Sequence, residues 1–223
     1  MAKGMSIKDA IKVFEEKKGV VAAEVEKAGR AEWDVPSNRE DGRNAIYAEN
    51  VQVSVYMRTC DLLTDHHQVV SSLLVCRHLA LSTNSIEKIS SLSGMESLKI
   101  LSLGRNLIKK IENLDAIADT LEELWISYNV IQSLSGIEKL QNLKVLLMSN
   151  NKIASWAEVD RLAGISSLED LLLVGNPLYN DYKDNNALSD YRVEVIKRLP
   201  NIRKLDGIPV DVDEREQANA AKA

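Results

Sequence analysis

Apolar residues recur along the middle of the chain in a pattern that repeats five times between residues 76 and 178. Each copy fits the template L-x-x-L-x-L-x-x-N-x-I-x-x-I. Self-similarity at a fixed period of this length predicts a stacked repeat architecture. The copies begin at Cys76, Leu98, Leu121, Leu143 and Leu168, and their asparagines (Asn84, Asn106, Asn129, Asn151 and Asn176) are 22, 23, 22 and 25 residues apart.

The template has a direct physical interpretation. Side chains alternate along a strand, so the L-x-L pair sends two side chains inward from a short strand. The asparagine then lies in the turn that leaves the strand, where its amide can satisfy backbone groups that the turn leaves unpaired. One repeat cannot bury its own apolar face, so neighbouring repeats must stack. The prediction is an α/β leucine-rich-repeat solenoid, with a parallel sheet on the concave face, short helices on the convex side and helical caps at both ends.

The rest of the chain divides around this array. Residues 1–28 predict an N-terminal capping helix, because Ser6 to Asp9 resemble a capping box and an apolar stripe follows at helical spacing. Residues 29–72 carry no repeat and are interpreted as a divergent insertion or linker, in which residues 51–56 alternate like one strand. The five repeats occupy 73–180. Residues 181–208 predict a C-terminal cap, with a helix ending before Pro200 and a last strand-like turn, and 209–223 predict a polar tail.

Strand residues that do not point inward form the predicted concave sheet face. The middle position of each L-x-L pair carries Ala80, Ser102, Trp125, Leu147 and Leu172 in turn. Trp125, Leu147 and Leu172, together with Val145 and Val174 from the neighbouring positions and Ile100 at the edge, form a contiguous apolar patch. An apolar patch where the pattern predicts solvent usually marks an interaction site, and Trp is often an energetic anchor. Partner binding is the favoured interpretation. The alternative is that the insertion or a second copy of the chain covers this face.

Composition narrows the function further. Aromatic residues make up only 4% of the 223 residues, so the core must be built from aliphatic side chains. The net charge of −5 argues against a nucleic-acid partner, because neutralising phosphates needs a basic face. No run of apolar residues is long enough to span a membrane, and two cysteines make no disulfide framework. A cytosolic location is expected.

A search for chemistry finds no enzyme. The three histidines, His66, His67 and His78, match no metal-ligand spacing, and no cofactor motif occurs. No nucleophile is accompanied by a base and an orienting group. A non-catalytic protein with no metal and no cofactor is therefore expected.

Several strings of residues also resemble one family, that of axonemal (outer-arm) dynein light chain 1. The sharpest is Glu-Glu-Leu-Trp-Ile-Ser-Tyr-Asn at 122–129. Similar runs occur at 7–10, 15–17, 81–89, 100–106, 148–153, 168–178 and 203–207, and the likeness covers about residues 1–27 and 73–223. The family's link is shorter and proline-rich where this chain has residues 28–72.

The resemblance implies a light chain in the axoneme of a cilium or flagellum, within the cytoskeleton, that regulates motility. It implies binding to the dynein heavy chain near the microtubule-binding stalk tip, with Trp125, Leu147 and Leu172 meeting the heavy chain. It also implies that the tail, including Asp211 and Arg215, lies where it can touch the motor or the microtubule, so tubulin is a further candidate partner. Net negative charge fits a modulator better than an independent microtubule anchor.

Two other functions stay open on the sequence. A phosphatase regulatory subunit of the short-repeat class is the main alternative, although such proteins usually carry about twice as many repeats. A spliceosomal leucine-rich subunit is the other, and the acidic balance permits it. Co-purification with axonemes separates the dynein light chain from both.

Overall fold

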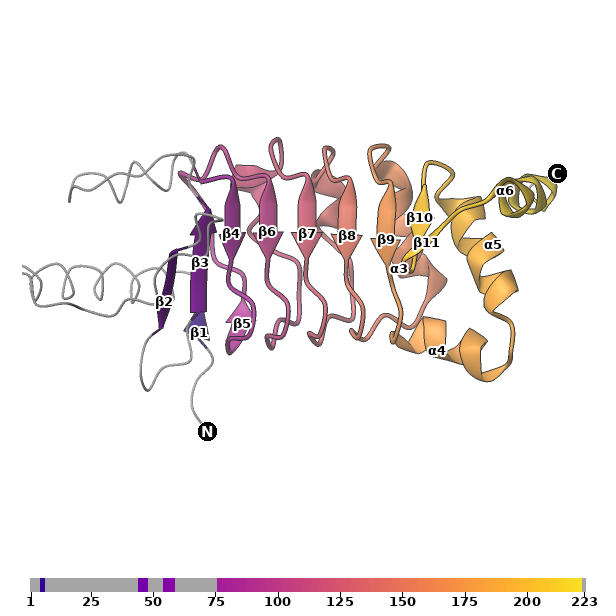
Figure 1. The fold of residues 1–223 in the computed structure, drawn as a ribbon, viewed down its shortest axis with the longest axis horizontal. Helices are drawn as coiled ribbons and strands as arrows, with labels where there is room; N and C mark the ends of the chain where they lie inside the picture. Colours follow the sequence, from indigo (N-terminus) through magenta and orange to yellow (C-terminus); the bar gives the residue numbers. More distant parts are fainter. Residues whose placement is uncertain (1–4, 7–43, 48–53, 59–75, 222–223) are drawn as a thin grey trace, which may run out of the picture.

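The computed structural model describes residues 5–6, 44–47, 54–58 and 76–221. Its main feature is a sheet with strand order β11-β10-β9-β8-β7-β6-β4-β3-β2, seen broadside in Figure 1. The strands from β4 to β10 pair in parallel, and β2, β3 and β11 add antiparallel pairs at the two ends. The strands are β2 (Asn44–Tyr47), β3 (Ser54–Arg58), β4 (His78–Ala80), β6 (Ile100–Ser102), β7 (Glu123–Trp125), β8 (Val145–Leu147), β9 (Asp170–Leu172), β10 (Lys204–Leu205) and β11 (Ile208–Pro209).

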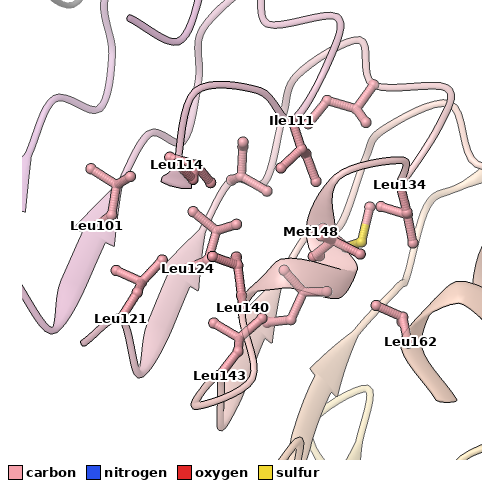
Figure 2. Packing of buried hydrophobic residues seen from close by; sticks show 14 of the residues in the cluster. Leu101, Ile111, Leu114, Leu121, Leu124, Leu134, Leu140, Leu143, Met148 and Leu162 are labelled. Atoms are coloured by element: carbon pink, nitrogen blue, oxygen red, sulfur yellow. The ribbon is translucent and has the colours of Figure 1, made fainter. Parts of the chain in front are cut away.

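The repeat register predicted from the template is confirmed. Leu79, Leu101, Leu124, Leu146 and Leu171 pair in sequence across β4, β6, β7, β8 and β9, and each is completely buried. The core is almost wholly aliphatic, as the scarcity of aromatic residues predicts. Figure 2 shows part of this cluster, in which Leu101 and Leu124 come from the strands and Leu114, Leu134, Leu140 and Leu162 come from the rest of the coils.

The convex wall follows the length of each repeat. Short repeats leave room only for the 3₁₀ turns η1 (Asp115–Ile117) and η2 (Ile137–Lys139). The last spacing between asparagines is 25 residues, and there the wall contains α3 (Trp156–Asp160) and η3 (Arg161–Gly164). The extra residues provide the length that an α-helical turn needs.

The asparagines form a continuous ladder through the solenoid. The side chain of Asn129 donates to the carbonyls of Leu103 and Ile126 at 3.0 Å each, and it accepts from the amide of Ile108 at 2.9 Å. Each asparagine thus joins its own coil to the preceding one. Asn106, Asn151 and Asn176 repeat this arrangement, and all four are at most 5% exposed.

The C-terminal cap closes the open end of the core. Helices α4 (Pro177–Asp184) and α5 (Leu188–Arg198) follow the last repeat, and α5 buries Tyr191, Val195 and Ile196 as its apolar stripe predicts. Strand β10 then pairs with β9, where Leu205 lies beside Leu171. Asp206 takes the place of a ladder asparagine, accepting from the amides of Leu173 and Val174 at 2.6 and 3.0 Å.

The predicted polar tail is part of this cap. Helix α6 (Val212–Ala220) packs beside α5 and buries Ala218. The helix has no apolar stripe, and the polar bonds described below hold it in place.

The N-terminal part is described only in short pieces. Met5–Ser6 form strand β1, which pairs with β5 (Ile86–Lys88), and the rest of the predicted capping helix lies outside the described residues. Strand β3 begins at Ser54, within the stretch predicted to form a strand, and 51–53 lie outside the described residues.

The ladder leads to a stability prediction. Asn129→Ala leaves one buried N–H and two buried carbonyls without their side-chain partner, so the free energy of unfolding should fall by about 3 kcal/mol. Urea denaturation measures it. Asn142→Ala is the matched control, because this exposed asparagine makes one bond, to the carbonyl of Asp119. A loss at Asn129 no larger than that at Asn142 would contradict the structural role of the ladder.

Candidate partner-binding face

Parallel pairing places the outward-facing residues of the strands in columns. In one column Ser102, Trp125, Leu147 and Leu172 are direct neighbours across β6 to β9. In the adjacent column Ile100 pairs with Glu123, Glu123 with Val145, and Val145 with Asp170. The structure therefore brings these predicted site residues together on one face, as the template implied.

The indole of Trp125 is the centre of this face. Its N–H donates to the carboxylate of Glu123 at 2.9 Å. Its ring meets that of His78 edge-on, with centroids 5.5 Å apart. Because His78 is on β4 and Trp125 is on β7, the indole must reach across β6. Both contacts hold the ring in one orientation before any partner arrives, which limits the entropy lost on binding.

Ser102 is the predicted site residue that the structure hides. It is 8% exposed and its hydroxyl is 2.8 Å from that of Ser82. With only 8% of its surface exposed, Ser102 offers little area for direct contact with a partner.

The remaining apolar members lie beside Trp125. Val145, Leu147 and Leu172 are half-buried on β8 and β9, and Val174 is half-buried just after β9. Ile100 is half-buried on β6, on the other side of Trp125. We call Ile100, Trp125, Val145, Leu147, Leu172 and Val174 the sheet-face patch.

A row of alternating charges borders the patch, one residue before each strand. Glu122 accepts from Lys99 at 2.5 Å and from Lys144 at 2.7 Å. Bonds from Lys144 and then Lys99 lower the pKa of Glu122 to about 2. Farther along, Arg203 lies 3.4 Å from Glu169, and Lys204 lies 2.9 Å from Asp170. Acids and bases here neutralise one another, so the border adds little net charge to the apolar face.

The two predicted tail residues have partners inside the chain. Asp211 caps α6, accepting from the amide of Glu214 at 2.8 Å, and Glu214 accepts from the amide of Asp211 at 3.1 Å. Arg215 donates to the carbonyls of Pro200, at 2.7 Å, and Ile202. Asp211 is exposed and Arg215 is half-buried. Asp211 therefore stabilises the start of α6, and Arg215 attaches α6 to the rest of the cap; neither role needs a partner protein.

Arg192 was not singled out from the sequence, yet it holds the same helix. Its guanidinium forms a salt bridge with Glu214 and donates to the carbonyl of Leu205 at 2.9 Å. The bond from Arg192 lowers the pKa of Glu214. Only a fold that brings α5 and α6 together joins these residues, which are 22 positions apart.

Two exposed apolar residues at this end were also missed. Ile208 is 58% exposed and Val212 is 69% exposed. Ile208 is on β11, which continues the sheet two strands beyond β9. The sequence signal that could have identified Ile208 and Val212 was the presence of apolar residues in a C-terminal stretch that is otherwise polar.

Within the described residues, no group of three or more His, Cys, Asp and Glu could hold a metal ion. No helix in this part of the chain has the length and apolar character needed to cross a membrane.

Comparison with known proteins first supports the class, a leucine-rich-repeat solenoid. A family model described as the NXF1/2/3/5 leucine-rich repeat domain matches residues 129–207. The crystal structure of the Drosophila melanogaster SNF/U2A′ complex contains a similar chain, with a TM-score of 0.56, 23% identity, and coverage of 64% of this chain and 79% of that one. This likeness concerns the fold alone.

Curated relatives then give the family. The Dynein axonemal light chain 1 of Chlamydomonas reinhardtii is 64% identical over 222 residues, covering 100% of this chain and 99% of that protein. The human protein of the same name is 44% identical over 219 residues, covering 98% and 100%. The chain belongs to the axonemal dynein light chain 1 family, which places it in the axoneme of cilia or flagella. The resemblance seen in the sequence is confirmed, and the phosphatase alternative is not favoured.

A further relative bears on chain length. The Danio rerio protein of the same name is 60% identical over 147 residues, which are 66% of this chain and 75% of that one. The same stretch is a larger share of the fish protein, so the fish protein is shorter. It remains a prediction that the extra length of this chain lies within residues 29–72.

The charged border gives a pH prediction. The folded pKa of Glu122, about 2, lies below its ordinary value of 4.5, so its contribution to stability is complete above pH 4.5 and is lost as the pH falls toward 2. From pH 4.5 to 2, the free energy of unfolding of wild type should therefore fall more steeply than that of Glu122→Gln. Chemical denaturation at a series of pH values measures both slopes. Glu96→Gln, at an exposed position, should keep the wild-type slope, and equal slopes for all three proteins would disprove the assignment.

The docking of α6 gives a second prediction. Arg192→Leu removes the salt bridge to Glu214 and the bond to Leu205, so amide hydrogen exchange in α6 should become at least about tenfold faster. Exchange in β7 and β8 should not change. Lys183→Leu, at an exposed position on α4, is the control. Unchanged protection in α6 would mean that Arg192 does not hold it.

Proposed function

We propose that the chain is a non-catalytic light chain of outer-arm dynein that binds the motor heavy chain through the sheet-face patch, near the microtubule-binding stalk tip, and regulates motility. The observation that supports this proposal is the position of Trp125, a half-buried indole held by Glu123 and His78 in the middle of an apolar surface.

The physical argument concerns pre-organisation. Each residue of the sheet-face patch extends from, or directly follows, a strand of the stacked sheet, so the patch behaves as a rigid template. A rigid template loses little entropy on binding, and a large aromatic side chain at its centre is the usual energetic anchor. An apolar side chain of the partner would pack against Trp125, Leu147 and Leu172.

Regulation follows from rigidity in this proposal. A light chain attached near the stalk tip would bias the conformations that the tip can adopt by binding one of them more tightly than the others. The acids and bases of the border neutralise one another, so they would neither strongly attract nor strongly repel the heavy chain as the light chain approaches it. Asp211 would contribute by capping α6 and Arg215 by keeping α6 docked, with Ile208 and Val212 as the exposed apolar contacts at that end.

A titration of the purified chain against a recombinant outer-arm dynein stalk tip tests this function. Trp125→Ala should weaken binding by about 2 kcal/mol or more, and Leu147→Asp should weaken it because it places an unpaired charge in the interface. Glu96→Ala, at an exposed position, should bind as wild type does, and circular dichroism should show all variants folded.

Three results would count against the proposal. Failure of wild type to bind the stalk tip would remove that partner. Wild-type affinity in both patch variants would move the interface to another face. Dimerisation of wild type that Leu147→Asp abolishes would assign the patch to a second copy of the chain.

A further inference from the structure

A second surface lies along the edge of the solenoid where the chain leaves each strand. The residue before each ladder asparagine has a positive φ, as at Arg105 (55°) and Tyr128 (57°), which turns its side chain out of the regular strand. Leu107, Val130 and Lys152 occupy the position after the asparagine in successive coils, and the amides of Leu107, Val130 and Lys152 bond to carbonyls of the preceding coil. These positions form a continuous flank beside the sheet.

This flank is apolar at its centre. Leu107 is 47% exposed and Tyr128 is 50% exposed, and Val130 is half-buried. The guanidinium of Arg105 lies over the Tyr128 ring, 4.8 Å from its centroid. Next to Val130, a shallow depression of about 520 Å³ is lined by Val130, Gln132, Lys152, Ala154, Ser155 and Glu158. The flank thus offers a ring, an aliphatic side chain and an adjoining hollow.

Several basic residues gather on the flank without acidic partners. Many basic residues elsewhere pair with acids, as Lys99 and Lys144 do with Glu122, whereas Arg77 and Lys183 are exposed and unbridged within the described residues but lie apart from one another in the sequence. On the flank, Arg105, Lys109 and Lys152 are exposed and form no salt bridge with any described residue. Lys88 and Lys110, one position farther round the coil, are exposed and likewise unbridged within the described part of the chain.

Acidic side chains offset only part of this cluster. Glu158, at the rim of the hollow, already accepts from the Ser133 hydroxyl, the Leu134 amide and Arg161. Glu87 occupies the position of Lys109 in the preceding coil and forms no salt bridge with a described residue, so it offsets part of the positive charge around Lys109, whereas Arg105 and Lys152 belong to other coils. A chain with a net charge of −5 therefore carries a local basic and apolar surface.

We propose that this flank patch, defined as Arg105, Leu107, Lys109, Tyr128, Val130 and Lys152, binds an extended acidic peptide segment of a partner protein. An aliphatic or aromatic side chain of the peptide packs on Leu107 and Tyr128. Carboxylates on either side of it meet Arg105, Lys109 and Lys152. The three coils concerned span about 10 Å, two spacings of about 4.8 Å, which an extended peptide covers in about three residues. The surface is separate from the sheet-face patch and does not depend on heavy-chain binding.

The chemistry of the flank favours a peptide over a nucleic acid. A protein that binds nucleic acid needs enough cations to neutralise a row of phosphates. Here a few cations surround an aliphatic centre in a protein of net negative charge. In an acidic peptide with one apolar residue, the carboxylates match the cations and the apolar residue matches the aliphatic centre.

Fluorescence anisotropy tests the proposal on the full chain. The probe is a short fluorescein-labelled peptide of glutamates around a central phenylalanine. Comparison probes replace phenylalanine by serine or glutamate by lysine, and an oligothymidylate of similar length represents nucleic acids. Wild type should bind the glutamate–phenylalanine probe most tightly, and its affinity should fall as salt is raised.

The solenoid itself supplies compatible substitutions. Asn150 and Ser85 occupy the positions of Tyr128 and Leu107 in other repeats, and Asn150 also has a positive φ, 53°. Tyr128→Asn combined with Leu107→Ser should therefore fold, as circular dichroism can verify, and should weaken probe binding at least about tenfold. Arg105→Thr, which copies Thr83 at the same position of the first repeat, should weaken binding and reduce its salt dependence. Trp125→Ala should bind the probe as wild type does.

Several outcomes overturn the proposal. These are no binding by wild type, equal or tighter binding of the lysine probe or the oligothymidylate, and wild-type affinity in the folded Tyr128 and Leu107 variant. Loss of probe binding in Trp125→Ala would assign the probe to the sheet-face patch. Heavy-chain binding is measured separately, so failure here leaves the proposed function untouched.

Discussion

The structure depends on the bonds that each ladder asparagine makes between two coils. A turn that leaves a strand and enters the next wall cannot pair its own amides and carbonyls, and the core side leaves no room for water. The asparagine amide supplies a donor and an acceptor at the same place, as Asn151 does for Ile126, Met148 and Ile131. Each bond set fixes the spacing and register of one coil on the next, and at the end of the array Asp206 supplies acceptors to the last turn.

Register turns this local bond into a surface. Because the ladder fixes the register of every coil on the next, side chains at the same template position become neighbours in space. A surface patch therefore forms without any further interaction to assemble it. Inward positions are restricted to aliphatic residues, whereas outward positions are free to vary. The sheet-face patch and the flank patch are two results of that freedom, one centred on Trp125 and one on Tyr128 and Leu107. A protein with a rigid interior can thus present distinct chemistry on two faces.

The template allowed the sheet, its order in the array and the column partners of Trp125 to be predicted, because period and alternation are properties of sequence. The template did not predict features that depend on contacts between side chains far apart in the sequence. The burial of Ser102 and the contact of the Trp125 ring with that of His78, two strands away, are such features. The docking of α6 depends on Arg192 and Arg215, whose partners come from other segments of the cap. Helix α4 was also missed, since Pro177 is as typical of a turn as of the first helical residue that it proves to be.

The measurement that tests the account most directly is site-specific photo-crosslinking in assembled outer-arm dynein. A benzophenone amino acid replaces Leu172 on the sheet face in one protein and Lys183 on α4 in another, and mass spectrometry identifies the crosslinked peptides. The account predicts crosslinks from position 172 to the heavy-chain stalk tip and none from position 183. Crosslinks to the stalk tip from position 183 alone, or from position 172 only to another copy of this chain, would contradict it.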